Sequence, residues 1–298
     1  MLYYILTAIS IITVFFIAVM IIDGNRFVIR EYTLESDKIQ DGIDMAVLAD
    51  LHNKQYGKDN CRLLEALDRM QPHVVLVAGD ILTAKPGKGY ELAASFMERV
   101  AEKYPVYYGL GNHEYRMKIY PEHYGDEFAE YMKRLKNAGI QVLDNQSAQI
   151  HIEREGKLTK LSVTGASIER RYYKRFRKIY MESDYLNNIV GKPNKDSYQI
   201  LLAHNPEYFE EYADWGADLI LSGHVHGGIM RLPILGGVVS PKLVFFPKYD
   251  GGLFERGSST MVLSRGLGMH TIPIRIFNPA ELVVIHLKPC KSKGFLVK

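Results

Sequence analysis

The chain has 298 residues, of which 47% are hydrophobic and 24% are charged, as is typical of a globular protein with one substantial core. Its net charge of +3 is too small to indicate nucleic-acid binding by itself. Cys61 and Cys290 lie far apart in the sequence, which excludes a disulfide framework and a CxxC metal site.

The first segment of the chain is predicted to cross a membrane. Leu2–Ile22 contains 21 residues and no charged side chain, and a helix of this length reaches across a hydrocarbon layer of about 30 Å. A buried helix of a soluble domain would show a polar face, and a signal peptide would need a basic start and a small-residue cleavage site. We therefore expect a transmembrane anchor over residues 1–22 and a linker over residues 23–42.

This anchor places the protein at the cell membrane. Arg26 and Arg30 follow the span and no basic residue precedes it, which favours a cytoplasmic C-terminal domain. Two charges leave the side of the membrane open, and the sequence does not indicate an oligomeric state.

From residue 43 to the end, the chain is predicted to form one catalytic domain, 43–298, of the α/β class. Apolar runs predict strands at 43–50, 73–80, 105–114, 198–204 and 217–224, and later at 260–266, 272–277 and 281–287. Helical spacing predicts helices at 60–70, 90–103, 127–139 and 206–215. Strands alternating with helices indicate an α/β sheet with a β-rich C-terminal part.

Polar side chains stand where these apolar strands end. They are Asp50, His52, Asp80, Asn112, His113, His204, His224 and His226. Each alone has a simpler interpretation as a turn residue, a helix N-cap or a hydrogen-bonded core histidine. Together they would bury unpaired polar groups unless they serve a common site, and ligands of open α/β sheets bind beyond the carboxyl ends of strands.

The chemistry of this set fits a pair of divalent metal ions. Imidazole and carboxylate suit Mn, Fe or Zn, and the strand ends offer no thiolate. Two ions about 3.5–4 Å apart need a bridging carboxylate, for which Asp80 on a central strand is the natural candidate. The site would remain cationic and attract phosphate. His113 is a candidate general acid, or alternatively a packing residue beside the ligands.

The motifs DLH (50–52), GD (79–80), GNHE (111–114), His204 and GHVH (223–226) resemble those of the calcineurin-like metallophosphoesterase superfamily in order and spacing. The resemblance spans about residues 50–290. It implies a four-layer αββα β-sandwich with flanking helices. It also implies that one metal is held by Asp50, His52, Asp80 and His226, and the other by Asp80, Asn112, His204 and His224. His113 would lie beside the scissile phosphate.

A narrower similarity points to the membrane-anchored bacterial phosphohydrolase branch of that superfamily. It is carried by FFPKYDGGLF (245–254), SRGLG (264–268) and PIRIFNPAEL (273–282), together with the N-terminal anchor. The expected function is hydrolysis of phosphate esters or diphosphates by a metal-bridging hydroxide, on a phosphorylated small molecule or a membrane-proximal lipid-linked diphosphate.

Two alternatives to this function are a nucleotide or nucleic-acid phosphodiesterase and a non-catalytic metal-binding scaffold of the same fold. All seven ligands and His113 are present, which favours catalysis over a scaffold. A membrane tether makes nucleic acid the less favoured partner.

Residues 170–178, RRYYKRFRK, interleave six basic residues with aromatic ones. Such a run is commonly a solvated surface. Next to a membrane anchor we favour contact with anionic lipid headgroups, and RNA binding is a third interpretation.

Overall fold

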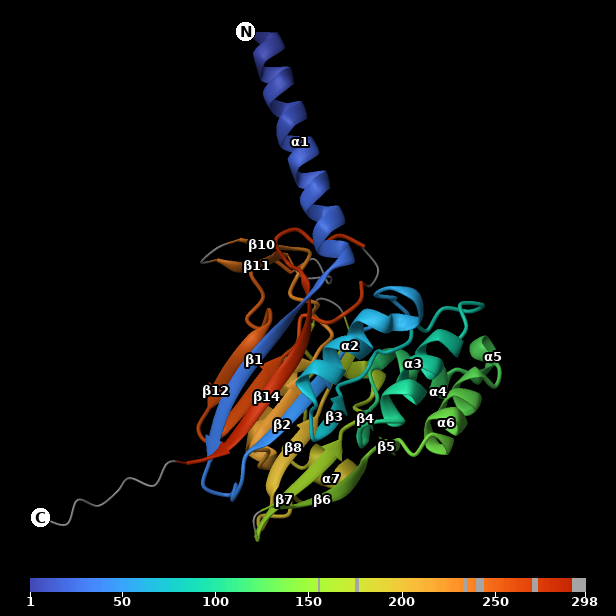
Figure 1. Ribbon diagram of the computed structural model, residues 1–298, viewed down its shortest axis with the longest axis vertical. Coiled ribbons are helices and arrows are strands. Elements are labelled where there is room, and N and C mark those ends of the chain that lie inside the picture. Colours follow the sequence, from blue (N-terminus) through green and yellow to red (C-terminus); the bar gives the residue numbers. More distant parts are fainter. Residues whose placement is uncertain (155, 175–176, 233–234, 240–243, 270–272, 291–298) are drawn as a thin grey trace, which may run out of the picture.

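Two six-stranded sheets pack face to face at the centre of the molecule, and a single long helix projects from one end of it (Figure 1). This is a computed structural model. It describes residues 1–154, 156–174, 177–232, 235–239, 244–269 and 273–290.

The first sheet has the strand order β1-β14-β2-β3-β4-β5. Its strands are β1 (Phe27–Ser36), β2 (Ile43–Leu48), β3 (Val74–Val77), β4 (Val106–Gly109), β5 (Gln141–Leu143) and β14 (Ala280–Pro289). The second sheet has the order β12-β13-β9-β8-β7-β6. Its strands are β6 (Gln146–Arg154), β7 (Lys157–Gly165), β8 (Tyr198–Leu202), β9 (Leu219–Ser222), β12 (Gly252–Arg256) and β13 (Ser259–Leu263). A separate hairpin joins β10 (Met230–Leu232) to β11 (Gly236–Val239).

The helices are α1 (Leu2–Asn25), α2 (Cys61–Met70), α3 (Glu91–Ala101), α4 (Asn112–Ile119), α5 (Pro121–Tyr124), α6 (Glu127–Asn137), α7 (Tyr185–Val190) and α8 (Phe209–Trp215). Short 3-10 turns occur at Lys58–Asn60, Arg170–Tyr173 and Pro206–Tyr208.

Three hydrophobic cores hold the layers together. The central core packs alternate side chains of the two sheets against each other, for example Met45 and Val47 of β2 with Ile200 and Leu202 of β8. A second core packs the other face of the first sheet against α2, α3 and α6, and a third packs the second sheet against α7 and α8. The predicted four-layer αββα sandwich is confirmed.

Strand direction puts one end of both sheets next to α1. The chain leaves α1 through β1, which runs away from the helix and pairs parallel with β14. β2 is antiparallel to β14 and therefore returns toward α1, and β3 and β4 are parallel to β2. The carboxyl ends of β2, β3 and β4 thus lie at the end of the domain that carries α1 (Figure 1).

The predicted linker over residues 23–42 is wrong. α1 continues to Asn25, and Phe27–Ser36 forms the edge strand β1 in a ten-residue pairing with β14. Its aromatic and apolar side chains alternate between two layers, because Phe27 packs on the helix-side core while Tyr32 and Leu34 pack on the central core. Residues 27–36 are therefore part of the folded domain.

The predicted strand at 272–277 is also wrong. Ile272 lies outside the described residues, and the described part of this segment makes only one isolated bridge, from Ile276 to Met230. Within this segment, Arg275 is 2% exposed, and its guanidinium donates hydrogen bonds to the backbone carbonyls of Arg265, Gly266 and Gly268. These bonds hold the segment as an irregular loop.

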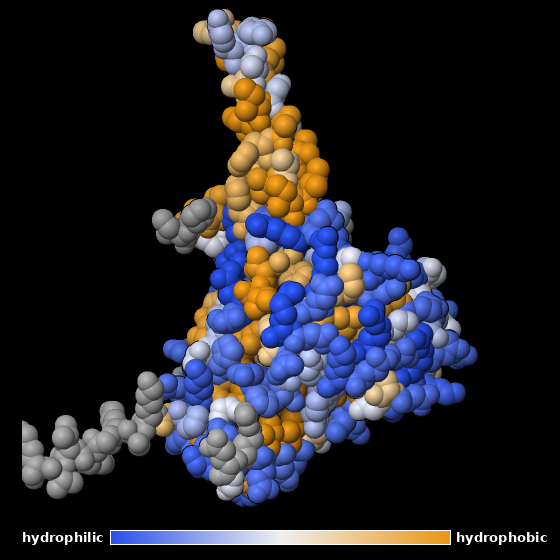
Figure 2. Space-filling model, in the orientation of Figure 1, coloured by the Kyte–Doolittle hydropathy of each residue, from blue (hydrophilic) through white to orange (hydrophobic). Residues whose placement is uncertain are grey.

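α1 is apolar and exposed over most of its length, in contrast to the mostly hydrophilic body below it (Figure 2). Among the described residues it is the one helix long and apolar enough to cross a membrane, a test that a signal sequence near an N-terminus would also pass.

Candidate metal centre

The carboxyl ends of five strands converge on one buried cluster of polar side chains. In the first sheet, Asp50 and His52 follow β2, Asp80 follows β3, and Asn112 and His113 begin α4 after β4. In the second sheet, His204 follows β8, and His224 and His226 follow β9. Hydrogen bonds from the backbone N–H of His224 to both carboxylate oxygens of Asp50, at 3.2 and 3.0 Å, join the two sheets at this point.

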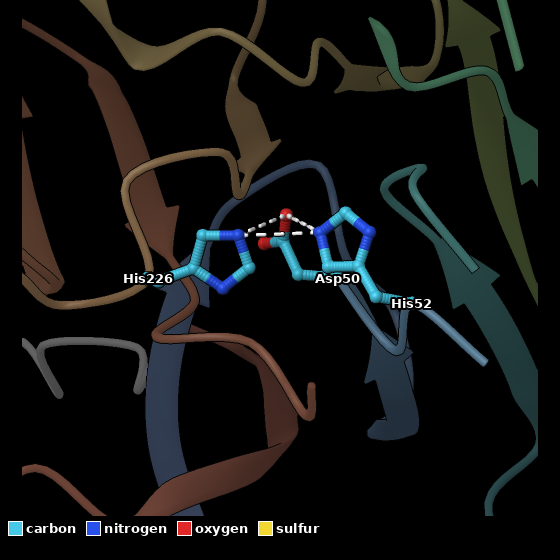
Figure 3. A group of neighbouring side chains, drawn as sticks. All are labelled: Asp50, His52 and His226. Carbon is cyan, nitrogen blue, oxygen red and sulfur yellow. Dashed lines mark hydrogen bonds and ion pairs between the residues drawn. The ribbon is translucent and has the colours of Figure 1, made fainter. Parts of the chain in front are cut away.

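One part of the cluster consists of Asp50, His52 and His226 (Figure 3). The Nε2 atoms of the two imidazoles lie 3.2 Å apart, and they lie 3.6 and 3.4 Å from Oδ1 of Asp50. The ligand atoms of all three residues lie within 4.8 Å of one another. Three donors aimed at one point from two sheets suit a transition-metal ion.

The adjoining part consists of Asp80, His204 and His224, whose ligand atoms also lie within 4.8 Å of one another. Nε2 of His204 is 3.0 Å from Oδ2 of Asp80, and the same oxygen is 3.9 Å from Nε2 of His52. Asp80 therefore faces imidazoles from both parts of the cluster, which is the position expected of a bridging carboxylate.

Asn112 supplies a further donor atom. In the part of the chain that the structure describes, its buried Oδ1 has no hydrogen-bond partner. A buried amide oxygen without a partner is costly unless a cation or solvent satisfies it. The residues present therefore fit a pair of divalent ions by donor chemistry and by this unsatisfied oxygen.

The backbone around the cluster is strained. Left-handed φ values occur at Asp50, His52, Asp80, His224 and His226. Such conformations cost of order 1–3 kcal/mol each and persist where the surroundings impose them. Close packing explains two nearby glycines, because a Cβ would lie 2.1 Å from Oδ1 of Asp80 at Gly111 and 2.3 Å from Oδ2 of Asp50 at Gly223.

Hydrogen bonds from outside the cluster orient two imidazoles. Nδ1 of His204 lies 2.7 Å from the carbonyl oxygen of Ala78, so Nδ1 carries the proton and Nε2 faces Asp80. Nδ1 of His113 instead accepts from the backbone N–H of Ala84 at 2.8 Å. The proton of a neutral His113 therefore sits on Nε2, which lies 4.0 Å from Oδ2 of Asp80. This tautomer lets His113 donate a proton toward the cluster.

Glu114 holds the loop that carries Asp80, a role that the motif alone did not assign. Its buried carboxylate accepts from the backbone N–H groups of Asp80, Ile81 and Gly111 at 2.9–3.0 Å and from the hydroxyl of Tyr108 at 2.7 Å. Burial, and then the charge of Asp80, raise the pKa of Glu114 to about 7. A Glu three residues after Gly111 at a helix start is a capping-box signal that could have identified it.

The two aspartates make the buried cluster strongly attractive to cations. Burial opposes ionisation of Asp80, but the facing imidazoles of His204 and His113 hold its pKa well below the usual value. Burial alone would lower the pKa of His204, yet the carboxylates of Asp80 and Asp50 raise it to about 10. Protons on imidazole thus balance the buried carboxylates, a task that metal cations would take over.

The cluster opens into a cavity of about 1050 Å³, which is reached by Asp80, Asn112, His113, His224 and His226. Seven basic side chains line it: Arg116, Arg170, Arg171, Lys174, Arg177, Lys178 and Lys248. Besides Asp80, the lining carboxylates are Glu207 and Glu210. Most of the basic run 170–178 therefore forms a wall of this cavity, while Arg175 and Phe176 lie outside the described residues.

The structure brings together all eight residues that the sequence analysis selected. Asp50, His52 and His204 lie behind the cavity surface, and the other five reach it. Sequence reasoning missed Arg116 and Lys248 as cavity residues, because one lies on the exposed side of a short helix and the other in a loop without a motif.

The part of the chain that carries the cluster is similar to known proteins. Residues 43–228 match the sequence model of a family described as calcineurin-like phosphoesterase. The chain is 24% identical over 265 residues to an uncharacterized metallophosphoesterase of Aquifex aeolicus, covering 87% of this chain and 91% of the relative. It is 23% identical over 264 residues to the uncharacterized metallophosphoesterase YkuE of Bacillus subtilis, covering 87% and 84%. It is 26% identical over 200 residues to the phosphodiesterase YaeI of Escherichia coli, covering 66% and 64%.

Among solved structures, the chain is similar to the NAD nucleotidase of Haemophilus influenzae, with 15% identity and a TM-score of 0.43 over 76% of this chain and 46% of that one. It is also similar to an Escherichia coli phosphoesterase, Yfce, with 10% identity and a TM-score of 0.34 over 77% and 82%.

Proposed function

Because the chain belongs to the calcineurin-like phosphoesterases, a class of metal-dependent phosphohydrolases, we propose that it hydrolyses a phosphate ester or diphosphate carried by a membrane lipid. One observation carries the proposal: the paired His/Asp clusters open into a basic cavity at the end of the domain from which α1 projects.

Seven residues would hold two divalent ions, Mn, Fe or Zn. We assign Asp50, His52, Asp80 and His226 to one ion and Asp80, Asn112, His204 and His224 to the other. When bound, the ions supply an activated water nucleophile and positive charge for the phosphoryl oxygens. The chain itself orients the ligands through the carbonyl of Ala78 on His204 and the carboxylate of Glu114 on the Asp80 loop.

His113 would protonate the leaving group. Its Nε2 carries the proton in the neutral ring and faces the cluster, while the backbone N–H of Ala84 fixes the ring through Nδ1. A histidine positioned in this way is suited to general-acid catalysis.

The basic wall would neutralise substrate charge. Carboxylates pair with Arg171, Lys178 and Lys248 through Glu169, Glu211 and Glu210. Among the described residues, Arg116, Lys174 and Arg177 have no carboxylate partner in the structure. Cationic side chains in a half-enclosed cavity favour a substrate with more than one anionic group, such as a diphosphate.

α1 would remain attached as a membrane anchor rather than be cleaved as a signal sequence. Its last turn belongs to the folded domain, because Asp23 is 2% exposed and its Oδ2 accepts from the backbone N–H of Asn278 at 3.0 Å. Cleavage before Arg26 would remove this buried contact.

A second candidate function is a phosphodiesterase acting on nucleotides. The relative from Escherichia coli is named a phosphodiesterase, and the cavity contains tyrosines at 115, 120, 173 and 249 that could stack on a base. A cavity of this size would accept either substrate.

Hydrolysis assays on the full-length protein in lipid nanodiscs separate the two candidates. Lipid diphosphates in the same bilayer, nucleotide diesters and a soluble aryl phosphate would each be tested with Mn, Fe, Zn or Mg supplied separately. Preference for the lipid diphosphate supports the first function, preference for nucleotide diesters supports the second, and no turnover with any metal would refute both.

A further inference from the structure

Exposed apolar side chains gather around the base of α1. Outside α1, the structure exposes several large apolar side chains, among them Leu235, Phe245, Phe246 and Phe277, at 60%, 69%, 59% and 40%. We name these four residues the apolar collar. Three of them are phenylalanines, which soluble surfaces seldom leave so accessible unless they meet a partner or a membrane.

The backbone at two collar residues is strained. Phe246 and Phe277 have φ values of 48° and 53°, in the left-handed region that bulky side chains avoid. This conformation is unfavourable for any residue that has a Cβ atom. Neither phenylalanine recovers that cost by burial in the domain core, so packing within the domain does not explain why these rings are held outward.

The collar is continuous with the membrane-spanning helix. The ring of Phe277 lies 6.2 Å from the rings of both Phe15 and Phe16, measured between centroids. The hairpin beside it is tied to the same region through bridges from Val239 to Phe245 and from Met230 to Ile276. In Figure 1, β10 and β11 lie beside the lower part of α1.

This contact sets the depth of Phe277, one of the four collar residues. Phe16 precedes Ile22, the last residue of the uncharged span, by six positions, which corresponds to about 9 Å along a helix. A bilayer that covers Leu2–Ile22 therefore surrounds Phe15 and Phe16 with hydrocarbon. The same bilayer must also surround Phe277, because the ring of Phe277 contacts both of those rings. Apolar side chains of interfacial segments reach about 5–10 Å into the boundary between the lipid headgroups and the acyl chains.

The collar also borders the catalytic cavity. Val244 and Pro247 line the cavity, while Phe245 and Phe246 between them are exposed. The same loop thus contributes to the cavity wall and is tied through Phe245 to the β10–β11 hairpin. A membrane in contact with the phenylalanines would hold lipid headgroups at the level of the cavity.

We propose that the apolar collar inserts into the bilayer beside α1 and presents the cavity to phosphate-bearing lipid headgroups. The consequence for substrate choice rests on the proposed function, whereas insertion of the collar does not. Anchor and collar would give two points of membrane contact and so fix the tilt of the domain.

Depth quenching tests insertion without any assay of activity. The full-length protein with Phe246→Trp is placed in phosphatidylcholine nanodiscs with or without brominated lipid. Leu158→Trp is the matched control, because Leu158 is 43% exposed on the β6–β7 hairpin, at the end of the sandwich opposite α1 (Figure 1). The signal of the native Trp215, which is 8% exposed, is subtracted. We expect at least threefold stronger quenching at position 246 than at position 158.

Equal quenching at the two positions would overturn the proposal. Equal quenching together with cross-linking of Phe246→Cys between two copies would assign the collar to a second copy of the chain instead. Absence of any phosphohydrolase activity would refute the proposed function but would leave the quenching result intact.

A turnover comparison tests the effect on substrate delivery. Phe245→Ser/Phe246→Ser should lower hydrolysis of a lipid diphosphate in the nanodisc about tenfold and leave a soluble aryl phosphate unchanged, while Leu158→Ser changes neither. Equal loss on both substrates, or no loss on the lipid, would contradict presentation of headgroups by the collar.

Discussion

The side chain of Asn278 donates a hydrogen bond from Nδ2 to the backbone carbonyl of His226 at 2.8 Å. The same nitrogen donates to the carbonyl of Gly228 at 2.7 Å, and the backbone N–H of Asn278 donates to Asp23 at the end of α1. One buried residue therefore connects the end of α1 to the loop that carries a candidate metal ligand.

Asn278→Ala should lower the free energy of unfolding by about 2 kcal/mol, because two buried carbonyls lose their donor. Looser positioning of His226 should also weaken metal retention. Thermal unfolding and metal analysis of the detergent-solubilised protein measure both effects, with the exposed Asn137→Ala as control. Wild-type stability in the Asn278 variant would contradict the structural role.

Asp80→Ala should remove both metals and abolish turnover, since this carboxylate faces imidazoles from both parts of the cluster. Metal content by mass spectrometry and hydrolysis of an aryl phosphate provide the measurement. The control Asp68→Ala, which removes an exposed carboxylate paired with Lys103, should retain both metals and full turnover. Two ions retained in the Asp80 variant would refute the bridging assignment.

His113→Ala should keep both metals but slow hydrolysis about 10²–10⁴-fold, with the greatest loss for esters that have poor leaving groups. A series of aryl phosphates with graded leaving-group pKa measures this slope. His123→Ala is the control, because that imidazole is 64% exposed on α5. Equal slowing of every ester would indicate a packing role for His113.

Metal binding should release protons and tighten as pH rises. With a pKa raised to about 10 by Asp80 and Asp50, His204 carries a proton at pH 7 in the metal-free site, and ligation through Nε2 must displace it. Affinity should therefore increase up to about tenfold per pH unit between pH 7 and pH 10, and fall as pH decreases. Calorimetry in buffers of different ionisation enthalpy would detect about one released proton from this residue; heats independent of the buffer would exclude it.

Removal of residues 1–25 should leave an active domain in mild detergent, but a fragment that retains Asp23 and Gly24 should be more stable. The longer fragment keeps the buried bond from Asn278 to Asp23, whose loss costs about 1–3 kcal/mol. Urea unfolding of the two fragments gives the difference. Equal stability of the two fragments would show that the end of α1 contributes nothing to the stability of the domain. Insolubility of the fragment that begins at Asp23 would show that the apolar helix, residues 2–22, is part of the fold.

Much of the site could be predicted from the sequence because its signals are local. Short apolar runs that end in Asp, Asn or His identify buried strands and their carboxyl ends, as at Asp80 and His204. The apolar segment Leu2–Ile22 needs only its length and lack of charge to indicate a spanning helix.

The remaining features depend on pairings between distant parts of the chain. β1 joins β14 across about 250 residues, a pairing that the pattern of Phe27–Ser36 does not encode and that made this strand look like a linker. That pairing directs β2 back toward α1, so it also decides that the candidate metal centre lies at the end of the domain from which α1 projects. The described basic residues of the run 170–178 became part of a cavity wall only when the second sheet carried them near Asp80. The sequence alone determined which side chains are candidates for the site. The order and direction of the strands decided where those side chains lie, because register and direction arise from contacts that no local periodicity specifies.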